Sequence, residues 1–159
     1  MQKKPLDLYR LMIRSVLASN GDQRIGNESA EHAKVLIEEL IRQATGSVDV
    51  VCHSLSDDVW GAQSVRDVIT SVVRKHSVRF RVVTQLPPSA SAVRFFHSVG
   101  ATIRCFAKEG WRANFLIVDG RYFRMEPDFA VRCGFAYVNR PAWAAELASA
   151  FEKIYAMAV

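Results

Sequence analysis

The chain has 159 residues, a length that one domain can fill and that is sufficient to bury a hydrophobic core. Half of the residues are hydrophobic and 23% are charged, a composition that excludes collagen-like, low-complexity and disordered proteins. Lys and Arg outnumber Asp and Glu by 21 to 16, and the net charge of +5 permits phosphate-rich partners. The apolar runs are too short to cross a bilayer and the first residues lack the apolar segment of a signal peptide, so we predict a cytoplasmic protein without membrane contact.

Two helices are predicted ahead of the first strand. The apolar side chains of Pro5–Ser19 recur at helical spacing. The segment that follows, through Gly26, has no periodic apolar pattern and is interpreted as a loop. Asn27 or Ser29 can cap the second helix, whose apolar residues repeat as far as Ala44.

A run of β-branched residues then predicts a buried strand over residues 47–52. Helices and strands alternate after it, and a series of strands precedes a final helix. The expected elements are a helix from Ser56 or Asp57 through Lys75, a strand Val78–Leu86, a short helix from Ser89 or Ser91 through Ser98, four strands at Ala101–Phe106, Phe115–Asp119, Tyr122–Met125 and Cys133–Val138, and a helix beginning at Pro141.

This order of elements predicts an α/β fold. Alternating strands and helices favour parallel strands joined by right-handed crossovers, and the later run of strands favours an antiparallel or mixed half. We therefore expect an α/β sandwich with a mixed sheet flanked by helices. No repeat or flexible linker divides the chain, so residues 1–159 are predicted to form a single domain.

The sequence offers no metal or cofactor motif. Cys52, Cys105 and Cys133 are spaced too widely for a structural zinc module, even with His53 added, and buried reduced thiols are the simpler interpretation. Nucleotide-binding glycine patterns are missing, so no cofactor is expected. The paired carboxylates at residues 38–39 are interpreted as solvated positions on the second helix.

The segment from residue 110 to residue 124, GWRANFLIVDGRYFR, resembles the His-x-Lys-x4-Asp signature of the phospholipase D superfamily. Asp119 and Gly120 stand at the Asp-Gly positions of that signature. Arg112 occupies the His position and Asn114 the Lys position, so the motif is degenerate. The flanking sequence resembles the same family over residues 27–157, and residues 1–20 would then be an N-terminal helix added to the core fold.

The resemblance implies a fold but not the family's reaction. Enzymes of the superfamily use one His as the nucleophile on phosphorus, a second His from a paired motif as the acid, and Lys to stabilise the phosphoryl oxygens. A guanidinium stays protonated and cannot attack, so Arg112 does not replace the His. One motif per chain implies a homodimer, which would only duplicate the loss. Asp119 is predicted to anchor a turn through backbone hydrogen bonds.

The leading hypothesis is a catalytically degenerate binding or regulatory module that works as a homodimer. Arg112 and Asn114, together with Arg121 and Arg124 of the same stretch, could hold the phosphate of a nucleic acid or another anionic ligand. In the alternative interpretation, Arg112 forms an ion pair with Glu126 or Asp128 on a neighbouring strand.

Two other functions are kept open. His53 follows the first long strand, where α/β sheets bind ligands, and could replace the missing nucleophile of a divergent phosphodiesterase or nuclease. The simpler interpretation is a half-buried His that hydrogen-bonds the next loop. The third hypothesis is a protein-interaction subunit that binds its partner through residues 5–19, although this helix could also pack on its own domain.

Overall fold

The computed structural model describes residues 5–159, so residues 1–4 of the predicted N-terminal segment 1–20 lie outside the described residues. The helices are α1 (Pro5–Ser19), α2 (Ala30–Arg42), α3 (Gln63–His76), α4 (Ala90–Ser98) and α5 (Pro141–Met157). The strands are β1 (Ile25–Asn27), β2 (Ser47–Cys52), β3 (Arg79–Thr84), β4 (Thr102–Cys105), β5 (Asn114–Val118), β6 (Tyr122–Glu126) and β7 (Gly134–Tyr137).

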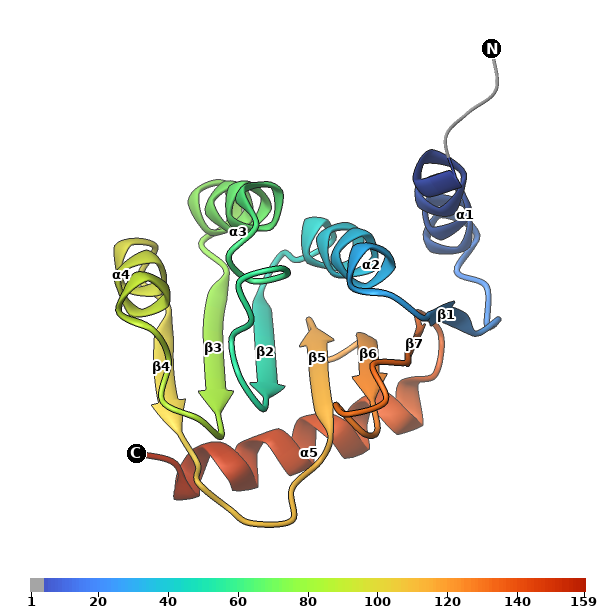
Figure 1. Ribbon diagram of the computed structural model, residues 1–159. Coiled ribbons are helices and arrows are strands. Elements are labelled where there is room, and N and C mark those ends of the chain that lie inside the picture. Colours follow the sequence, from blue (N-terminus) through green and yellow to red (C-terminus); the bar gives the residue numbers. More distant parts are fainter. Residues whose placement is uncertain (1–4) are drawn as a thin grey trace.

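The strands form one mixed, seven-stranded sheet in the order β1-β7-β6-β5-β2-β3-β4 (Figure 1). Strands β2, β3 and β4 are parallel, and α3 and α4 connect them. Strand β5 pairs antiparallel with the other edge of β2, and β6, β7 and β1 continue the antiparallel half. The predicted α/β class, with its parallel first half and antiparallel second half, is confirmed.

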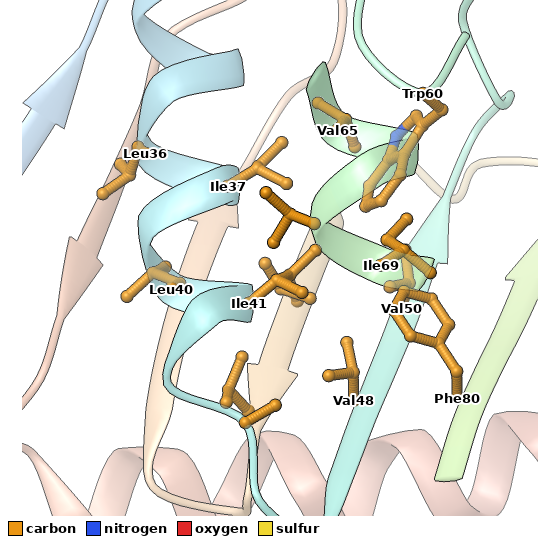
Figure 2. Packing of buried hydrophobic residues seen from close by; sticks show 14 of the residues in the cluster. Leu36, Ile37, Leu40, Ile41, Val48, Val50, Trp60, Val65, Ile69 and Phe80 are labelled. Carbon is orange, nitrogen blue, oxygen red and sulfur yellow. The ribbon is translucent and has the colours of Figure 1, made fainter. Parts of the chain in front are cut away.

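Helices cover both faces of the sheet, because alternate residues of each strand point to opposite sides. Helices α1 to α4 pack on one face, and Figure 2 shows Ile37 and Ile41 of α2 and Ile69 of α3 lying over Val48 and Val50 of β2. The long helix α5 crosses the other face and buries its own cluster of apolar residues there (Figure 1). This arrangement leaves the ends of the strands as the places where a site can open.

Most boundaries lie within two residues of the prediction, but the segment before Asn27 and the start of α3 differ from it by more. The segment before Asn27 is not all loop, because Ile25–Asn27 forms the edge strand β1 against β7. Three residues are too few to show a period-two pattern. Helix α3 begins at Gln63 rather than at residue 56 or 57. The chain turns so tightly before it that a Cβ on Gly61 would lie 2.7 Å from the carbonyl oxygen of Asp57, and Ala62 has an extended backbone.

The carboxylates of Glu38 and Glu39 are buried, so the prediction that they are solvated is wrong. Only 2% of Glu38 and 1% of Glu39 are exposed. Arg10 of α1 bonds both carboxylates, and Arg14 bonds Glu39 at 3.0 Å. Ser64 of α3 donates to Glu38 at 2.6 Å. The N-terminal helix is therefore attached to α2 of its own chain by ion pairs whose carboxylates are buried. No helix in residues 5–159 combines the length and the apolar character that crossing a membrane requires.

Candidate functional site

A cavity of about 200 Å³ opens where β2 ends, between the start of β5 and the N-terminal turn of α2. From β2 the chain proceeds to β3 on one side, while β5 occupies the other side. Open α/β sheets bind ligands at such a crevice beyond the carboxyl ends of the strands. Polar and apolar residues both line the cavity, with Ile37, Val50 and Leu116 among the apolar ones. We call this cavity the β2 pocket.

His53 lines the β2 pocket and is held in place on several sides. Its backbone N–H donates to Asn114 Oδ1 at 2.7 Å, and its carbonyl accepts from the backbone N–H of Leu86 at 2.9 Å. The imidazole ring stacks on Phe129, with ring centroids 3.9 Å apart and planes 8° from parallel. Its Nδ1 lies 2.8 Å from Gln85 Oε1. The orientation of the ring is thus determined by its surroundings.

Gln85 also determines which nitrogen of His53 carries the proton. Its Nε2 donates to the carbonyl oxygens of Lys108 and Trp111, at 3.1 Å each. Carbonyl oxygens can only accept, so the amide oxygen of Gln85 must be the atom that faces His53. Nδ1 of His53 is therefore a donor, and in the neutral ring Nε2 carries the free lone pair.

Asn114, at the Lys position of the motif, serves the backbone of the neighbouring strand. Its Oδ1 accepts from His53, which leaves its Nδ2 as a donor on a side chain that lines the β2 pocket. Asn114 pairs directly with Glu126 across β5 and β6, and Glu126 lines the same pocket. Cross-strand partners have adjacent side chains, so an amide and a carboxylate lie next to each other at the pocket wall.

Arg124 is the buried cation of the β2 pocket, with 5% of the residue exposed. Its Nε donates to Asn27 Oδ1 at 3.0 Å, and its Nη2 donates to Glu126 at 3.0 Å. Nη1 has no hydrogen-bond partner within residues 5–159. Burial lowers the pKa of Arg124, and the nearby Glu126 carboxylate acts in the opposite direction. The protein therefore holds a buried guanidinium whose Nη1 forms no hydrogen bond within residues 5–159.

Arg112, at the His position, lies outside the β2 pocket. Its side chain is 55% exposed and its Nη2 lies 2.8 Å from Asp128. The guanidinium also sits 5.3 Å from the ring centroid of Phe129. The hydrogen bond from Arg112 holds the pKa of the Asp128 carboxyl below its ordinary value. Arg112 is predicted either to bind an anion or to form an ion pair with Glu126 or Asp128. The structure has the ion pair with Asp128, which lies in the loop after β6 rather than on a strand.

The remaining motif residues lie at the opposite end of β5. Asp119 and Gly120 have φ angles of 55° and 64°, the left-handed turn that joins β5 to β6. The Asp119 carboxylate accepts from the backbone N–H groups of residues 45, 46 and 47, at 2.8 to 3.0 Å. Arg121, in the same turn, donates to Asn20 at 3.1 Å. The four side chains predicted to hold an anion are thus separated, and only Asn114 and Arg124 reach the β2 pocket.

Sequence reasoning missed Gln85, although a usable signal was present. Cys52 pairs with Thr84 in the parallel ladder of β2 and β3, so the next residues, His53 and Gln85, emerge side by side at one edge of the sheet. A polar residue directly after each of two adjacent parallel strands marks that edge. Within residues 5–159, no cluster of three or more His, Cys, Asp or Glu side chains is placed to hold a metal ion.

No protein-family model matches the sequence, and no curated protein matches it. Solved structures do resemble the fold. Nuc from Salmonella typhimurium, a phospholipase D family member, superposes with a TM-score of 0.63 at 14% identity, over 87% of this chain and 96% of Nuc. NucT from Helicobacter pylori superposes with a TM-score of 0.64 at 12% identity, over 87% of this chain and 99% of NucT.

A third structure is TrmBL2, an archaeal chromatin protein with a described mode of DNA binding. Its TM-score is 0.64 at 12% identity, over 96% of this chain and 60% of TrmBL2. Identities this low carry information on the fold alone. The chain has the fold of the phospholipase D family, as the segment around Asp119 predicted.

Proposed function

We propose that this chain is a phosphate-binding module of phospholipase D fold, which holds the phosphate group of a nucleic acid or a phosphorylated small ligand in the β2 pocket. It acts without the histidine and lysine chemistry of the family motif, and it works as a homodimer.

The free Nη1 of Arg124 carries this proposal. The residue Arg124 is buried, so its guanidinium lacks part of the hydration that its charge would have in solvent, and an anion at Nη1 would compensate for it. Asn114 Nδ2 adds a neutral donor to the same pocket. The first turn of α2, with Ser29 as its cap, also lines the pocket, and the positive end of a helix dipole favours an anion there.

The charges around the β2 pocket are balanced, so placement of donors rather than net charge would select the ligand. Arg124 and Arg132 line the pocket together with Glu126 and Asp58. Glu126 is already bonded to Arg124 Nη2, and within residues 5–159 no hydrogen bond is formed by Nη1. Phosphate oxygens accept several hydrogen bonds at once and suit such a set of donors.

The motif positions support binding rather than covalent catalysis. Arg112 cannot act as a nucleophile because its guanidinium stays protonated, and it is paired with Asp128. The oxygen of Asn114 is used by the backbone of His53. The DNA-binding chromatin protein among the structural neighbours supports nucleic acid as the phosphate source.

The outer face of α1 supports the homodimer. Leu8, Leu11 and Met12 are 54%, 42% and 40% exposed and lie at helical spacing on one stripe, while Ile13 and Val16 of the same helix are buried. Rows of exposed apolar side chains are typical of protein interfaces. Light scattering should give the mass of a dimer for the native chain, and Leu11→Glu should shift it toward the monomer. An unchanged monomer in both would remove the homodimer from the proposal.

The phosphate site can be tested by fluorescence anisotropy with a short single-stranded oligonucleotide, with and without a 5′-phosphate. Arg124→Gln should weaken binding by at least roughly tenfold, because a hydrogen bond to a charged group is worth about 1.5–3 kcal/mol. Arg112→Gln is the matched control, since it removes an exposed Arg outside the pocket. Ala33→Leu fills the pocket from α2 without removing a charge and should also weaken binding.

Competition with inorganic phosphate separates the ligand classes. If free phosphate displaces the oligonucleotide, the pocket recognises the phosphate group itself. Equal binding by the native chain, Arg124→Gln and Ala33→Leu would overturn the proposed site, provided circular dichroism shows all three folded.

A further inference from the structure

We propose that His53 gives the β2 pocket a reaction of its own: hydrolysis of a phosphodiester, with His53 as the general base that activates water. The proposal rests on the phosphate site described above, because Arg124 and Asn114 would hold the ester that the water attacks. It uses a residue outside the family motif.

The orientation of His53 is the first argument. A general base must present an unprotonated nitrogen, and a third group must hold it in the right tautomer. Gln85 Oε1 fixes the proton on Nδ1 at 2.8 Å, and the two carbonyls that hold the Gln85 amide prevent it from turning over. Nε2 has no hydrogen-bond partner within residues 5–159. This nitrogen is consequently free to accept a proton.

The rigidity of the surroundings is the second argument. Backbone hydrogen bonds at both the N–H and the C=O of His53, together with the parallel ring of Phe129, leave the imidazole little freedom. Such layered support is typical of groups that must be preorganised for chemistry.

The reaction needs no other reagent than water. The water oxygen forms a bond to phosphorus while its proton moves to Nε2, and the bond from phosphorus to the leaving oxygen breaks. The leaving oxygen takes a proton from solvent water and the protonated Nε2 releases its proton to solvent, so the products are a phosphomonoester and an alcohol, and His53 returns to its starting state. Arg124 Nη1 and Asn114 Nδ2 would stabilise the negative charge on the phosphoryl oxygens.

General base action fits the pocket better than attack by His53 itself. A nucleophilic mechanism needs a second group to protonate the leaving oxygen, as the paired His does in the phospholipase D superfamily. Among the described residues that line the β2 pocket, His53 is the one imidazole, and the two carboxylates there belong to Asp58 and Glu126. With water as the nucleophile one imidazole is sufficient, because no phosphohistidine forms that a second base would have to release.

Hydrolysis of bis-p-nitrophenyl phosphate and of a short single-stranded oligonucleotide, both with EDTA present, tests the proposal. The native chain should turn over both substrates, and His53→Gln should lose at least roughly 100-fold in kcat, the lower bound for general base catalysis. His97→Gln is the matched control, because His97 is an exposed histidine of α4 outside the pocket. It should leave the rate unchanged.

Gln85→Glu distinguishes a positioning role of Gln85 from a structural one. A carboxylate at Nδ1 favours the protonated imidazole, so the acidic limb of the pH–rate profile should move to higher pH. The charged groups around the ring, which stay unchanged in this variant, are Asp58, Glu126, Arg124, Arg132 and the Arg112–Asp128 pair near Phe129. Simple loosening of the loop would lower the rate at every pH without moving that limb.

The outcomes separate this inference from the proposed function. Phosphate binding that depends on Arg124, without any turnover above that of His53→Gln, overturns the general base and leaves the binding site standing. Loss of the Arg124 dependence overturns the binding site. Turnover that is lost in both Arg124→Gln and His53→Gln, but kept in His97→Gln, supports both.

Discussion

Asn114 and His53 are joined by a hydrogen bond of 2.7 Å from the backbone N–H of His53 to Oδ1 of Asn114. The bond continues the pairing of β2 and β5 beyond the end of β2, with a side chain in place of a carbonyl. The side chain of Asn114 thus extends the hydrogen bonding of the sheet by one residue of the β2 side.

Replacing Asn114 by Ala should destabilise the protein by roughly 1–3 kcal/mol, because the N–H of His53 loses its acceptor. Urea unfolding and hydrogen exchange at the His53 amide measure the loss. Asn114→Asp keeps an acceptor and should protect the amide. Asn114→Lys, which restores the motif's residue type, should behave like Ala. Full protection in the Lys variant would show that this bond does not hold His53.

Asp119 should be a structural residue only. Asp119→Ala removes the acceptor of three backbone N–H groups and of the Thr45 hydroxyl, and leaves Ala at a φ of 55°. We expect a loss of at least roughly 1.5–3 kcal/mol in the free energy of unfolding. Asp119→Asn should cost less, since Asn tolerates the left-handed backbone. Oligonucleotide binding by the folded variant should equal that of the native chain, and weaker binding would place Asp119 in the site.

Stability in acid should depend on Glu39. Burial by itself raises the pKa of Glu39, but hydrogen bonds from Arg14 and Arg10 lower it by more, so the net pKa lies below its ordinary value of 4.5. A carboxyl with a depressed folded pKa contributes stability above its unfolded pKa and loses it as the pH falls through the folded value. Stability should therefore decline below about pH 4.5.

Arg10→Met tests this pairing. With one guanidinium removed, the pH of half-unfolding should rise, and the free energy of unfolding at neutral pH should fall by about 1–3 kcal/mol. Arg140→Met is the control, because Arg140 and Asp22 form a pair at 3.7 Å in which both side chains are largely exposed. An equal effect of both variants on the acid transition would exclude a special contribution of Glu39.

The cysteines should differ sharply in reactivity. Burial raises the pKa of Cys52 to about 12, so its thiolate is scarce at neutral pH, whereas Cys133 is exposed. A thiol reagent such as DTNB should modify Cys133 first in the native protein, and Cys52 only on unfolding. Mass spectrometry of the partly labelled protein identifies the site. Early labelling of Cys52 would show that the wall of the β2 pocket opens in solution.

Local patterns were sufficient for most of the elements. The apolar spacing of α2 and its Ser29 cap identified that helix, and Asp119-Gly120 identified the turn between β5 and β6. Local patterns failed where a structure depends on a contact between residues that lie far apart in the sequence. Strand β1 exists through its pairing with β7, more than 100 residues later, and Glu38 and Glu39 are buried because α1 brings arginines to them.

The amino-acid sequence by itself determined the class of fold, because periodicity and residue identity are local properties. Only the tertiary structure decided which side chains form a site. His53, Asn114 and Arg124 come from three strands or strand ends, and the position of β5 beside β2 brings them to one pocket, while Gln85 after β3 bonds His53. The same geometry directs Arg112 to Asp128 and Arg121 to the far end of the sheet, since a side chain's partners depend on strand register rather than on distance along the chain.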